Sequence, residues 1–436
     1  MKVYIDTLGC PKNISDSEHA AGLLMKNGHI IEDDPGKADV ILVNTCGFIN
    51  DAKEESIDRI LELSEQKAED AILVVSGCLS QRYKEELGKA MPEAQIIIGV
   101  NEYELLPKLL LEYRAGRQIS CFNGWKEEYP EPGARSSLTA PYSSYLKIAE
   151  GCNNICAYCI IPAIRGGYRS RNMENIAAEA RLLVDKGSRE LVLIAQDITA
   201  YGMDLYGEYR LPRLLEMLCE IKDLRWIRLM YCYEDRITDD LIRVMADNPK
   251  ICKYIDIPIQ HASDKILRGM NRRSTRKSIE STIEKLRKAM PDIHIRTTLI
   301  SGFPGESRED ALILEEFVEN MRFERLGVFA YSKEEGTAAY NMENQVPKRT
   351  KLARRDRLMR MQQQISLEHN LQKIGEVYEV LVEEWDGETY TGRSAYDAPE
   401  IDNKVIFTSD KELMPGDFVM VKIDDGFDYD LSGHAV

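Results

Sequence analysis

The chain has 436 residues and a formal net charge of −16, with 44% hydrophobic and 30% charged residues. This composition is typical of a globular protein, and the length suggests two to four domains. No run of about 18 apolar residues occurs, so the sequence predicts no membrane-spanning helix. The negative charge argues against wholesale wrapping of nucleic acid, although a local basic site is compatible with it. Residues 1–6 begin a strand-like pattern without the apolar region of a signal peptide, and we expect a cytoplasmic protein.

Short apolar runs alternate with helical patterns over the first predicted domain, residues 1–122. We expect strands at residues 2–7, 38–43, 71–75 and 95–98, with helices at residues 15–26, 51–67 and 81–90. This alternation predicts βαβ units and a parallel sheet. A linker rich in Gly, Pro and charged residues follows over residues 123–144.

The second predicted domain, residues 145–370, repeats the strand–helix theme six times. The strands are expected at residues 145–149, 190–195, 226–230, 254–259, 294–300 and 326–330, before a connecting helix at residues 348–360. Six sequential units predict a partial or full α/β barrel, and the chemistry of such barrels lies at the carboxyl ends of the strands.

The third predicted domain, residues 371–436, has short strand runs at residues 378–382, 404–407 and 418–423. This pattern predicts a small antiparallel barrel of the size of an OB fold. The domain holds 16 acidic and 5 basic residues, a balance of −11, so most of the net charge of the chain lies here. General solubility would explain acidity but not its concentration in one domain.

Three cysteines share one short loop after the first strand of the second domain. Cys152, Cys156 and Cys159 form the spacing C-x3-C-x2-C. Thiolates are the ligands of iron–sulfur clusters, and three of them leave one iron of a four-iron cluster open to another molecule. The alternative is a zinc site or chance, but zinc sites usually bring four ligands in two CxxC pairs, and that four-ligand pattern is absent here.

A second set of cysteines follows three predicted strands of the first domain. Cys10, Cys46 and Cys78 are separated by 36 and 32 residues, and each separation fits one βαβ unit. Because the carboxyl ends of parallel strands share one edge, these thiols can meet there. Cysteines are also good core residues, but only a second cluster site explains the shared position. The remaining cysteines show no pattern and are interpreted as buried or incidental: Cys121, Cys219, Cys232 and Cys252.

The C-x3-C-x2-C loop, with Tyr158 before its last cysteine, resembles that of the radical S-adenosylmethionine superfamily. The resemblance implies a (β/α)6 partial barrel and a 4Fe-4S cluster whose open iron binds the amine and carboxylate of S-adenosylmethionine. An electron from the cluster then splits the sulfonium and releases a radical. Candidate cofactor contacts are Tyr158, Gln196, Gln260, Gly302, Gly305 and Glu306. The alternatives without a functional role are structural hydrogen bonds for the glutamines and a simple turn for the glycines.

The order of the three domains resembles that of the methylthiotransferases, in which the C-terminal barrel is called TRAM. Matching pieces include Leu8-Gly9-Cys10-Pro11-Lys12-Asn13, Asn44-Thr45-Cys46-Gly47-Phe48-Ile49 and Gly302-Phe303-Pro304-Gly305-Glu306. The resemblance implies insertion of a methylthio group at an unactivated C–H bond, using two S-adenosylmethionine molecules and two 4Fe-4S clusters. The six cysteines of the two triads would be the cluster ligands, and a flavodoxin or ferredoxin would supply electrons.

Members of this family modify either a transfer-RNA adenosine (MiaB-type) or an aspartate of a small-subunit ribosomal protein (RimO-type). An acidic barrel repels RNA and attracts a basic ribosomal protein, which favours the second substrate and argues against direct tRNA binding. The RimO-type branch is also resembled by the sequence around Cys10 and by the segment Asp397-Ala398-Pro399-Glu400-Ile401-Asp402. A non-enzymatic alternative is a two-cluster electron carrier, but a carrier would bring four ligands per cluster.

Three weaker signals complete the sequence reading. Arg165 and Arg169 follow the cluster loop and could bind a carboxylate, including that of a substrate aspartate, although surface pairing is the alternative. Basic residues cluster over residues 348–360 and could contact RNA, but a solvated helix face is the favoured interpretation. His261 receives no role, because radical hydrogen abstraction needs no base.

Overall fold

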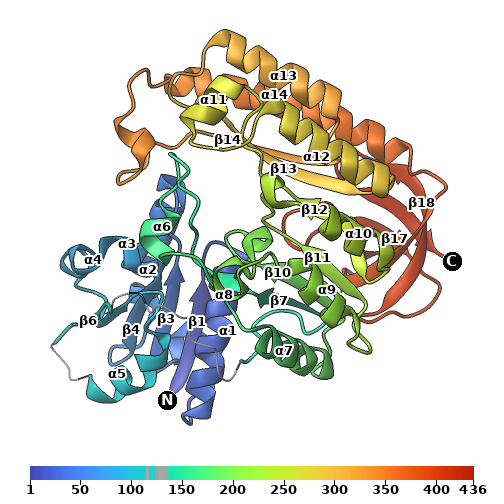
Figure 1. Cartoon of the computed structure of the whole chain (residues 1–436). Coiled ribbons are helices and arrows are strands. Elements are labelled where there is room, and N and C mark those ends of the chain that lie inside the picture. Colours follow the sequence, from blue (N-terminus) through green and yellow to red (C-terminus); the bar gives the residue numbers. More distant parts are fainter. Residues whose placement is uncertain (114–116, 124, 126–134) are drawn as a thin grey trace.

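The structure is a computed structural model that describes residues 1–113, 117–123, 125 and 135–436 (Figure 1). An N-terminal sheet domain and a central barrel domain lie side by side, and a small C-terminal barrel packs on the central domain. The linker predicted over residues 123–144 includes residues 124 and 126–134, which lie outside the described residues. Within the described part, no helix has both the length and the apolar composition needed to cross a membrane.

The N-terminal domain is a six-stranded sheet in the order β2-β1-β3-β4-β5-β6, with every adjacent pair parallel. Its strands are β1 Lys2–Thr7, β2 Ile30–Ile31, β3 Val40–Thr45, β4 Ile72–Gly77, β5 Ile96–Ile98 and β6 Ile119–Cys121. Its helices are α1 Pro11–Lys26, α2 Asn50–Gln66, α3 Cys78–Tyr83, α4 Glu85–Ala90 and α5 Leu106–Glu112, with short 3-10 turns η1 Pro35–Lys37 and η2 Tyr103–Leu105.

Helices cover both faces of this sheet, which explains its continuous apolar strands. Along β3, Val40 and Leu42 pack against α1 and α5, whereas Ile41 and Val43 pack against α2, α3 and α4. Successive side chains of a strand point to opposite faces, so a strand buried on both sides is apolar throughout. The predicted parallel sheet is therefore confirmed.

Two details of this domain differ from the sequence prediction. The helix expected at residues 81–90 is two helices, α3 and α4, separated by Lys84 in a left-handed conformation (φ 47°). No Gly or Pro marks that break, so periodicity alone could not place it. The sheet also continues past residues 95–98 into the short strand β6.

The central domain is a second six-stranded parallel sheet, in the order β14-β13-β12-β11-β10-β7. Its strands are β7 Ser143–Lys147, β10 Glu190–Ile194, β11 Trp226–Leu229, β12 Ile251–Asp256, β13 His294–Ser301 and β14 Arg325–Ala330, with a separate pair β8 Ala149–Glu150 and β9 Arg169–Ser170. Its helices are α6 Ile161–Arg165, α7 Met173–Asp185, α8 Met203–Tyr206, α9 Leu211–Cys219, α10 Asp239–Asp247, α11 Asp264–Gly269, α12 Arg276–Ala289 and α13 Arg308–Met321, with 3-10 turns η3 Ile198–Ala200, η4 Glu234–Arg236 and η5 Ala338–Asn341.

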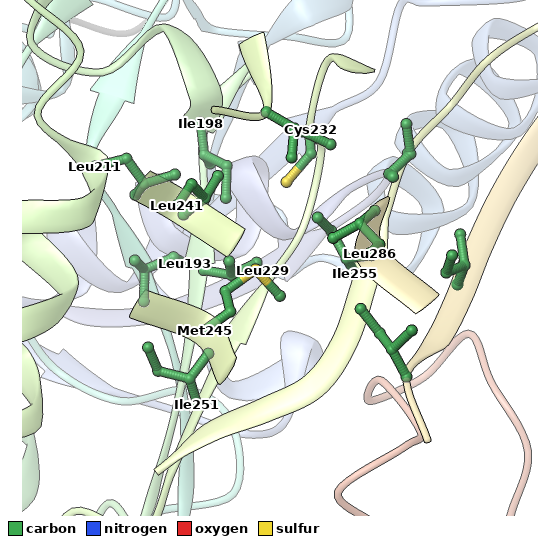
Figure 2. Packing of buried hydrophobic residues seen from close by; sticks show 14 of the residues in the cluster. Leu193, Ile198, Leu211, Leu229, Cys232, Leu241, Met245, Ile251, Ile255 and Leu286 are labelled. Atoms are coloured by element: carbon green, nitrogen blue, oxygen red, sulfur yellow. The ribbon is translucent and has the colours of Figure 1, made fainter. Parts of the chain in front are cut away.

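A large apolar core lies between this curved sheet and its outer helices. Figure 2 shows Leu193 and Leu229 of the strands meeting Leu241 and Met245 of α10. The strand order follows the chain order, as expected for consecutive right-handed βα units. The sheet does not close on itself, so the predicted six-unit partial barrel is confirmed.

A long helix, α14 Lys348–Leu371, connects this domain to the C-terminal barrel, and it runs 11 residues beyond the predicted end at residue 360. The barrel strands are β15 Val377–Trp385, β16 Tyr390–Ser394, β17 Val405–Thr408, β18 Phe418–Gly426 and β19 Leu431–Ala435. They close in the order β15-β16-β17-β19-β18. The predicted small barrel is confirmed, and one pair that the sequence did not reveal, β17 with β19, is parallel.

A buried ionic network joins the C-terminal barrel to the central domain. Glu190, at the start of β10, accepts from Arg228 Nε at 2.8 Å and from Arg393 Nη2 of the C-terminal barrel at 2.7 Å. Burial opposes the ionised form of Glu190, but the charges of Arg393 and Arg228 outweigh it and lower its pKa to about 2. The carboxylate is therefore the shared counter-ion of two buried guanidinium groups.

We expect Glu190→Gln to destabilise the protein by about 3–5 kcal/mol, because it leaves the buried Arg228 without its counter-ion and Arg393 with Glu383 alone. The folded-state pKa of Glu190 is depressed, so its contribution is present above the ordinary value near 4.5 and is lost as the pH falls towards 2. Urea unfolding of both proteins at pH 7 and at acidic pH measures this. A difference that does not shrink with acidification would contradict the assignment.

Candidate functional site

The carboxyl edge of the N-terminal sheet brings the first cysteine triad together. Cys10 precedes α1, Cys46 follows β3, and Cys78 begins α3 after β4. The connecting loops interleave: a Cβ placed on Gly9 would lie 2.8 Å from Cys46 Cβ, and one on Gly47 would lie 2.9 Å from the carbonyl carbon of Cys78. The structure thus places all three cysteines at one edge, as the spacing predicted.

Two glycines make this close approach possible. Gly9 and Gly77 both have left-handed backbones, with φ of 91° and 95°. A side chain at Gly77 would also collide with the backbone of Thr45 at 2.4 Å. Only glycine adopts this conformation and leaves this space without strain, so each loop can turn its cysteine towards the others.

The electrostatics of this triad suit a metal better than free thiols. Burial, and then the charge of Cys78, raise the pKa of Cys46 to about 12. Burial also raises the pKa of Cys78, while the nearby Arg165 guanidinium opposes that shift. Thiolates crowded in an apolar setting need a compensating cation, and a metal centre supplies one as it displaces the protons.

The second triad lies in the loop between β8 and α6, beyond the carboxyl end of β7. Backbone N–H groups already donate towards two of its sulfurs, from Asn154 to Cys152 Sγ and from Ile161 to Cys159 Sγ, both at 3.4 Å. Such bonds stabilise thiolate ligands of iron–sulfur clusters. Over the described residues, no three Cys, His, Asp or Glu side chains are gathered at metal-ligand spacing as they stand. In both triads the thiols must therefore turn before they can share a metal.

Side chains from neighbouring strand ends brace the cluster loop. Asn154 Nδ2 donates to Asp197 at 3.0 Å, and Arg236 donates to Asn154 Oδ1 at 2.8 Å. Tyr233 Oη lies 2.7 Å from Cys156 Sγ, and the Arg272 guanidinium stacks 4.1 Å above the Tyr233 ring. These contacts fix the loop against the barrel edge, so Asp197 serves the loop through Asn154.

The glutamines predicted to contact the cofactor lie at the ends of strands. Gln196 follows β10, and its Nε2 donates to Glu150 at 2.6 Å, while its buried Oε1 has no partner among the described residues. Gln260 has a strained φ of 71° and continues the ladder beside β13 through Thr298 and Ile300. Tyr158 packs beside the Phe303 cluster and is partly buried. Gln196 is thus the one of the three with a buried acceptor left over for a ligand.

The loop after β13 is held by the carboxylate of Glu306. Its Oε2 accepts from the backbone N–H groups of Gly302 at 2.6 Å and Phe303 at 3.2 Å, and its Oε1 pairs with Arg354 at 2.7 Å. The carboxylate is fully engaged, so Glu306 positions the loop. Gly302 and Gly305 both have positive φ, and no atom lies within 4 Å of a Cβ built on Gly305, which leaves that backbone open to a ligand.

Part of the basic run of α14 is paired with the central domain. Arg354 binds Glu306, Arg357 binds Glu315 at 2.8 Å, and Lys351 donates to the carbonyl of Tyr331 at 2.9 Å. Ion pairs with acidic neighbours are what the solvated-face interpretation predicted. Arg354 connects this helix directly to the loop that Glu306 holds.

Arg165 lies at the junction of the two triads, and the expectation of a surface pairing for it is wrong. It is buried, with Nη1 bound to Asp16 at 2.7 Å and to Glu150 at 3.3 Å. Its Nη2 donates to Asn13 Oδ1 at 2.6 Å and to Cys78 Sγ at 3.3 Å. With both ends of the fork engaged, Arg165 links α6 of the central domain to the first triad.

Sequence reasoning missed one further residue of this junction. Lys12, on the first turn of α1, reaches across to the central domain, and its Nζ lies 3.2 Å from the centre of the Tyr231 ring. Tyr231 follows β11 in a left-handed conformation (φ 62°), and its N–H donates to Asp256 at 3.1 Å. The motif around Cys10 was visible in the sequence, but nothing in it showed which strand Lys12 would meet.

Three family profiles match successive parts of the chain. Residues 2–99 match the family described as uncharacterized protein family UPF0004, residues 146–318 match the radical SAM superfamily, and residues 374–436 match the TRAM domain. These ranges follow the three bodies of the fold in chain order.

Three full-length relatives carry the same name. Proteins named ribosomal protein uS12 methylthiotransferase RimO are 49% identical in Caldanaerobacter subterraneus subsp. tengcongensis, covering 99% of both chains, and 50% identical in Desulforamulus reducens, covering 98% of both. The protein of that name in Clostridioides difficile is 48% identical and covers 100% of this chain and 99% of its own.

Solved structures share the fold at low sequence identity. The radical S-adenosylmethionine methyltransferase TsrM of Kitasatospora setae has a TM-score of 0.56 and 13% identity, over 75% of this chain and 72% of its own. The cobalamin-dependent S-adenosylmethionine radical enzyme OxsB has a TM-score of 0.51 and 12% identity, over 84% of this chain and 62% of its own. Both confirm the architecture alone.

Proposed function

Because the chain belongs to the ribosomal protein uS12 methylthiotransferase RimO family, a radical SAM family, we propose that it adds a methylthio group to the β-carbon of an aspartate in ribosomal protein uS12. The observation that carries the proposal is the pair of cysteine triads, one at each of two strand edges, joined by Arg165. An electron carrier would not need two cysteine triads at strand edges that meet at one junction between domains. The reaction class is therefore transfer of a sulfur group, and the enzyme is a radical SAM methylthiotransferase.

The residues present fit two 4Fe-4S clusters and S-adenosylmethionine. We assign one cluster to Cys10, Cys46 and Cys78, whose loops need glycine to converge, and the other to Cys152, Cys156 and Cys159, whose sulfurs face backbone N–H donors. When bound, these groups supply the radical that abstracts hydrogen, together with the methyl group and the sulfur that are transferred. Cofactor contacts are proposed for Tyr158, Gln196, Gln260, Gly302 and Gly305, with Glu306 holding the loop.

The contribution of the protein itself is to hold both triads against one substrate carbon. We assign residues 1–122 to the domain of the first cluster, residues 145–370 to the radical SAM domain and residues 371–436 to the TRAM domain. Arg165, which ends α6 only six residues after Cys159, reaches Cys78 of the other domain. A fixed junction lowers the entropy lost when two reacting groups must meet at one atom.

The C-terminal barrel is proposed to attract the basic ribosomal protein. Its two buried basic residues, Lys373 and Arg393, are offset by the buried carboxylates of Asp397 and Asp402, so its surface keeps the acidic balance of its composition. The exposed acidic side chains are Glu376, Glu384, Asp386, Glu388, Glu400, Asp410, Glu412, Asp417, Asp424 and Asp425. A field of one sign raises the rate of encounter with a partner of opposite charge and opposes RNA.

Removing the negative charges from the hairpin between β15 and β16 should slow the association of the protein with uS12. We expect the triple variant Glu384→Gln, Asp386→Asn, Glu388→Gln to lower the association rate for uS12 several-fold at low salt, with little change at high salt, since screening removes the steering. Surface-immobilised uS12 at two ionic strengths measures both rates.

The matched control removes the same charge from the N-terminal domain, as Asp51→Asn, Glu54→Gln, Glu55→Gln on α2, whose side chains are also exposed. An equal loss of rate in that control would show a general charge effect and would contradict docking at the barrel.

The activity is tested by mass spectrometry on anaerobic, cluster-reconstituted protein given reductant, S-adenosylmethionine, and either uS12 or bulk transfer RNA. A methylthio gain on an aspartate of uS12 alone is expected. A gain on transfer RNA alone would overturn the assigned substrate and the argument from the acidic barrel. We propose a flavodoxin or ferredoxin as the electron donor and the cytoplasm, where ribosomal proteins are made, as the location.

A further inference from the structure

A buried lysine side chain lies beside the first triad, where the two domains meet, without a hydrogen-bonded or ion-paired anion among the described residues. Lys12 is two residues after Cys10 and is only 8% exposed. Its aliphatic stem crosses from α1 of the N-terminal domain to the carboxyl end of β11 in the central domain, where its ammonium rests on the ring of Tyr231. The ammonium thus lies at the junction of the two strand edges where the chemistry is assigned.

Nothing in the described part of the chain forms a hydrogen bond or an ion pair with Lys12 Nζ. The ammonium instead lies over the face of the Tyr231 ring, with Nζ 3.2 Å from the ring centre. Lysines this buried are almost always paired with an anion, because burying an unpaired charge is costly. A cation–π contact recovers only about 2 kcal/mol even where water is excluded. The arrangement is that of a binding site with one partner still to arrive.

The carboxylates of the chain near this lysine are engaged elsewhere. Glu150 is bound by Lys147 at 2.8 Å and by Arg165 and Gln196, and Asp256 is bound by Arg296 at 2.9 Å and by the N–H of Tyr231. These side chains shape the surroundings of Lys12 but do not pair with it. Cys10, whose thiolate also attracts Lys12, is assigned to the first cluster, so a carboxylate for Lys12 comes from another molecule.

We propose that Lys12 binds the side-chain carboxylate of the substrate aspartate and thereby determines the specificity of the enzyme for aspartate. This inference rests on the proposed function, which places an aspartate at the junction. An ammonium with three donors forms short, charge-assisted hydrogen bonds to a carboxylate. Arg165, another buried cation of the junction, has both ends of its fork occupied by Asp16, Glu150, Asn13 and Cys78, and Lys147 is paired with Asp16 and Glu150.

The position of Lys12 also accounts for the carbon that reacts. The β-carbon of aspartate is bonded directly to the carboxyl carbon, so a carboxylate held at Lys12 keeps that carbon close by. Lys12 belongs to the same first turn as Cys10, a ligand of the cluster assigned to sulfur transfer. Anchoring the carboxylate on this turn therefore presents the β-carbon next to the sulfur donor, and a neutral side chain would lack the anchor.

The experiment is a double-mutant cycle on the reconstituted full-length enzyme. The equilibrium dissociation constant for uS12 is measured anaerobically for the wild type, Lys12→Met and Lys12→Arg, each with native uS12 and with uS12 in which the target aspartate is asparagine. Lys26→Met, at the exposed far end of the same helix, is the matched control. Iron content and release of 5′-deoxyadenosine from each protein report whether both sites are intact.

We expect Lys12→Met to weaken binding of native uS12 by about tenfold or more, to leave binding of the asparagine form unchanged, and to retain both clusters, because the removed charge pair accounts for the coupling. Lys12→Arg should recover part of the affinity, and Lys26→Met should match the wild type. Equal losses for both forms of uS12, or loss of a cluster with Lys12→Met, would overturn the inference. Failure of the wild type to modify uS12 would instead overturn the proposed function.

Discussion

Cys46→Ala is expected to abolish methylthio transfer while S-adenosylmethionine is still cleaved, whereas Cys156→Ala is expected to abolish both. The reason is spatial: Cys46 belongs to the edge of the N-terminal sheet, and Cys156 belongs to the loop after β8 of the central domain. The two triads lie in loops of different domains. Each variant therefore removes a ligand from one cluster and leaves the other cluster intact. Each variant should retain about half of the iron, since each cluster holds four irons.

The measurement combines iron and sulfide content with chromatography of 5′-deoxyadenosine and mass spectrometry of uS12, all under anaerobic conditions. Cys219→Ala is the control, because this half-buried cysteine lies at the end of α9, outside both triads. Loss of all iron in either variant would contradict two independent clusters. Methylthio transfer by Cys46→Ala would contradict the role of the first triad.

The architecture was predictable because its signals are local. Runs such as residues 40–43 are apolar on both faces, and this distinguishes a strand of a buried parallel sheet from an amphipathic one. Once the strands are placed, topology alone gathers Cys10, Cys46 and Cys78 at one edge, since residues that follow parallel strands share that edge. The gathering of these three cysteines at one edge was therefore predictable without any knowledge of side-chain contacts.

The junction between the domains was not predictable, because it depends on how two separately folded bodies meet. Arg165 reads as a surface arginine after a cysteine loop, yet it is buried against Asp16 of the N-terminal domain. Lys12 reads as a solvated residue on a first helical turn, yet it lies on Tyr231, more than 200 residues later in the chain. No periodicity records contacts at such separations, and the backbone of Tyr231 has a strained conformation that sequence does not reveal.

The segment from Asp397 to Asp402, which resembles the RimO-type branch, has a structural role that its sequence did not show. Asp397 binds Arg325 at the start of β14, and Asp402 accepts from Tyr254 Oη of β12 at 2.6 Å. Ala398 packs into an apolar cluster with residues of β10 and β11. The segment thus fixes the C-terminal barrel to the central sheet.

Arg165→Met is expected to destabilise the protein by about 3–5 kcal/mol, because it leaves a surplus of buried negative charge. Asp16 and Glu150 are both shared with Lys147, which supplies one positive charge for two carboxylates once the guanidinium is gone. Chemical unfolding of the protein before cluster reconstitution measures the effect without any contribution from metal. Arg213→Met removes an exposed ion pair with Glu216 and should change stability by no more than about 0.5 kcal/mol.

If unpaired charge causes the loss of stability, a second substitution should have an effect that a packing defect would not show. If the cost of Arg165→Met is unpaired charge, adding Asp16→Asn should return part of the lost stability, because it removes one of the two carboxylates that compete for Lys147. A defect caused by lost volume would be unchanged or worsened by that second substitution. Arg165→Lys separates charge from geometry: it restores the cation but not the fork that spans Glu150 and Cys78. Stability close to wild type with a weakened first cluster would then show that the shape of the guanidinium, and not its charge alone, joins the two halves of the site.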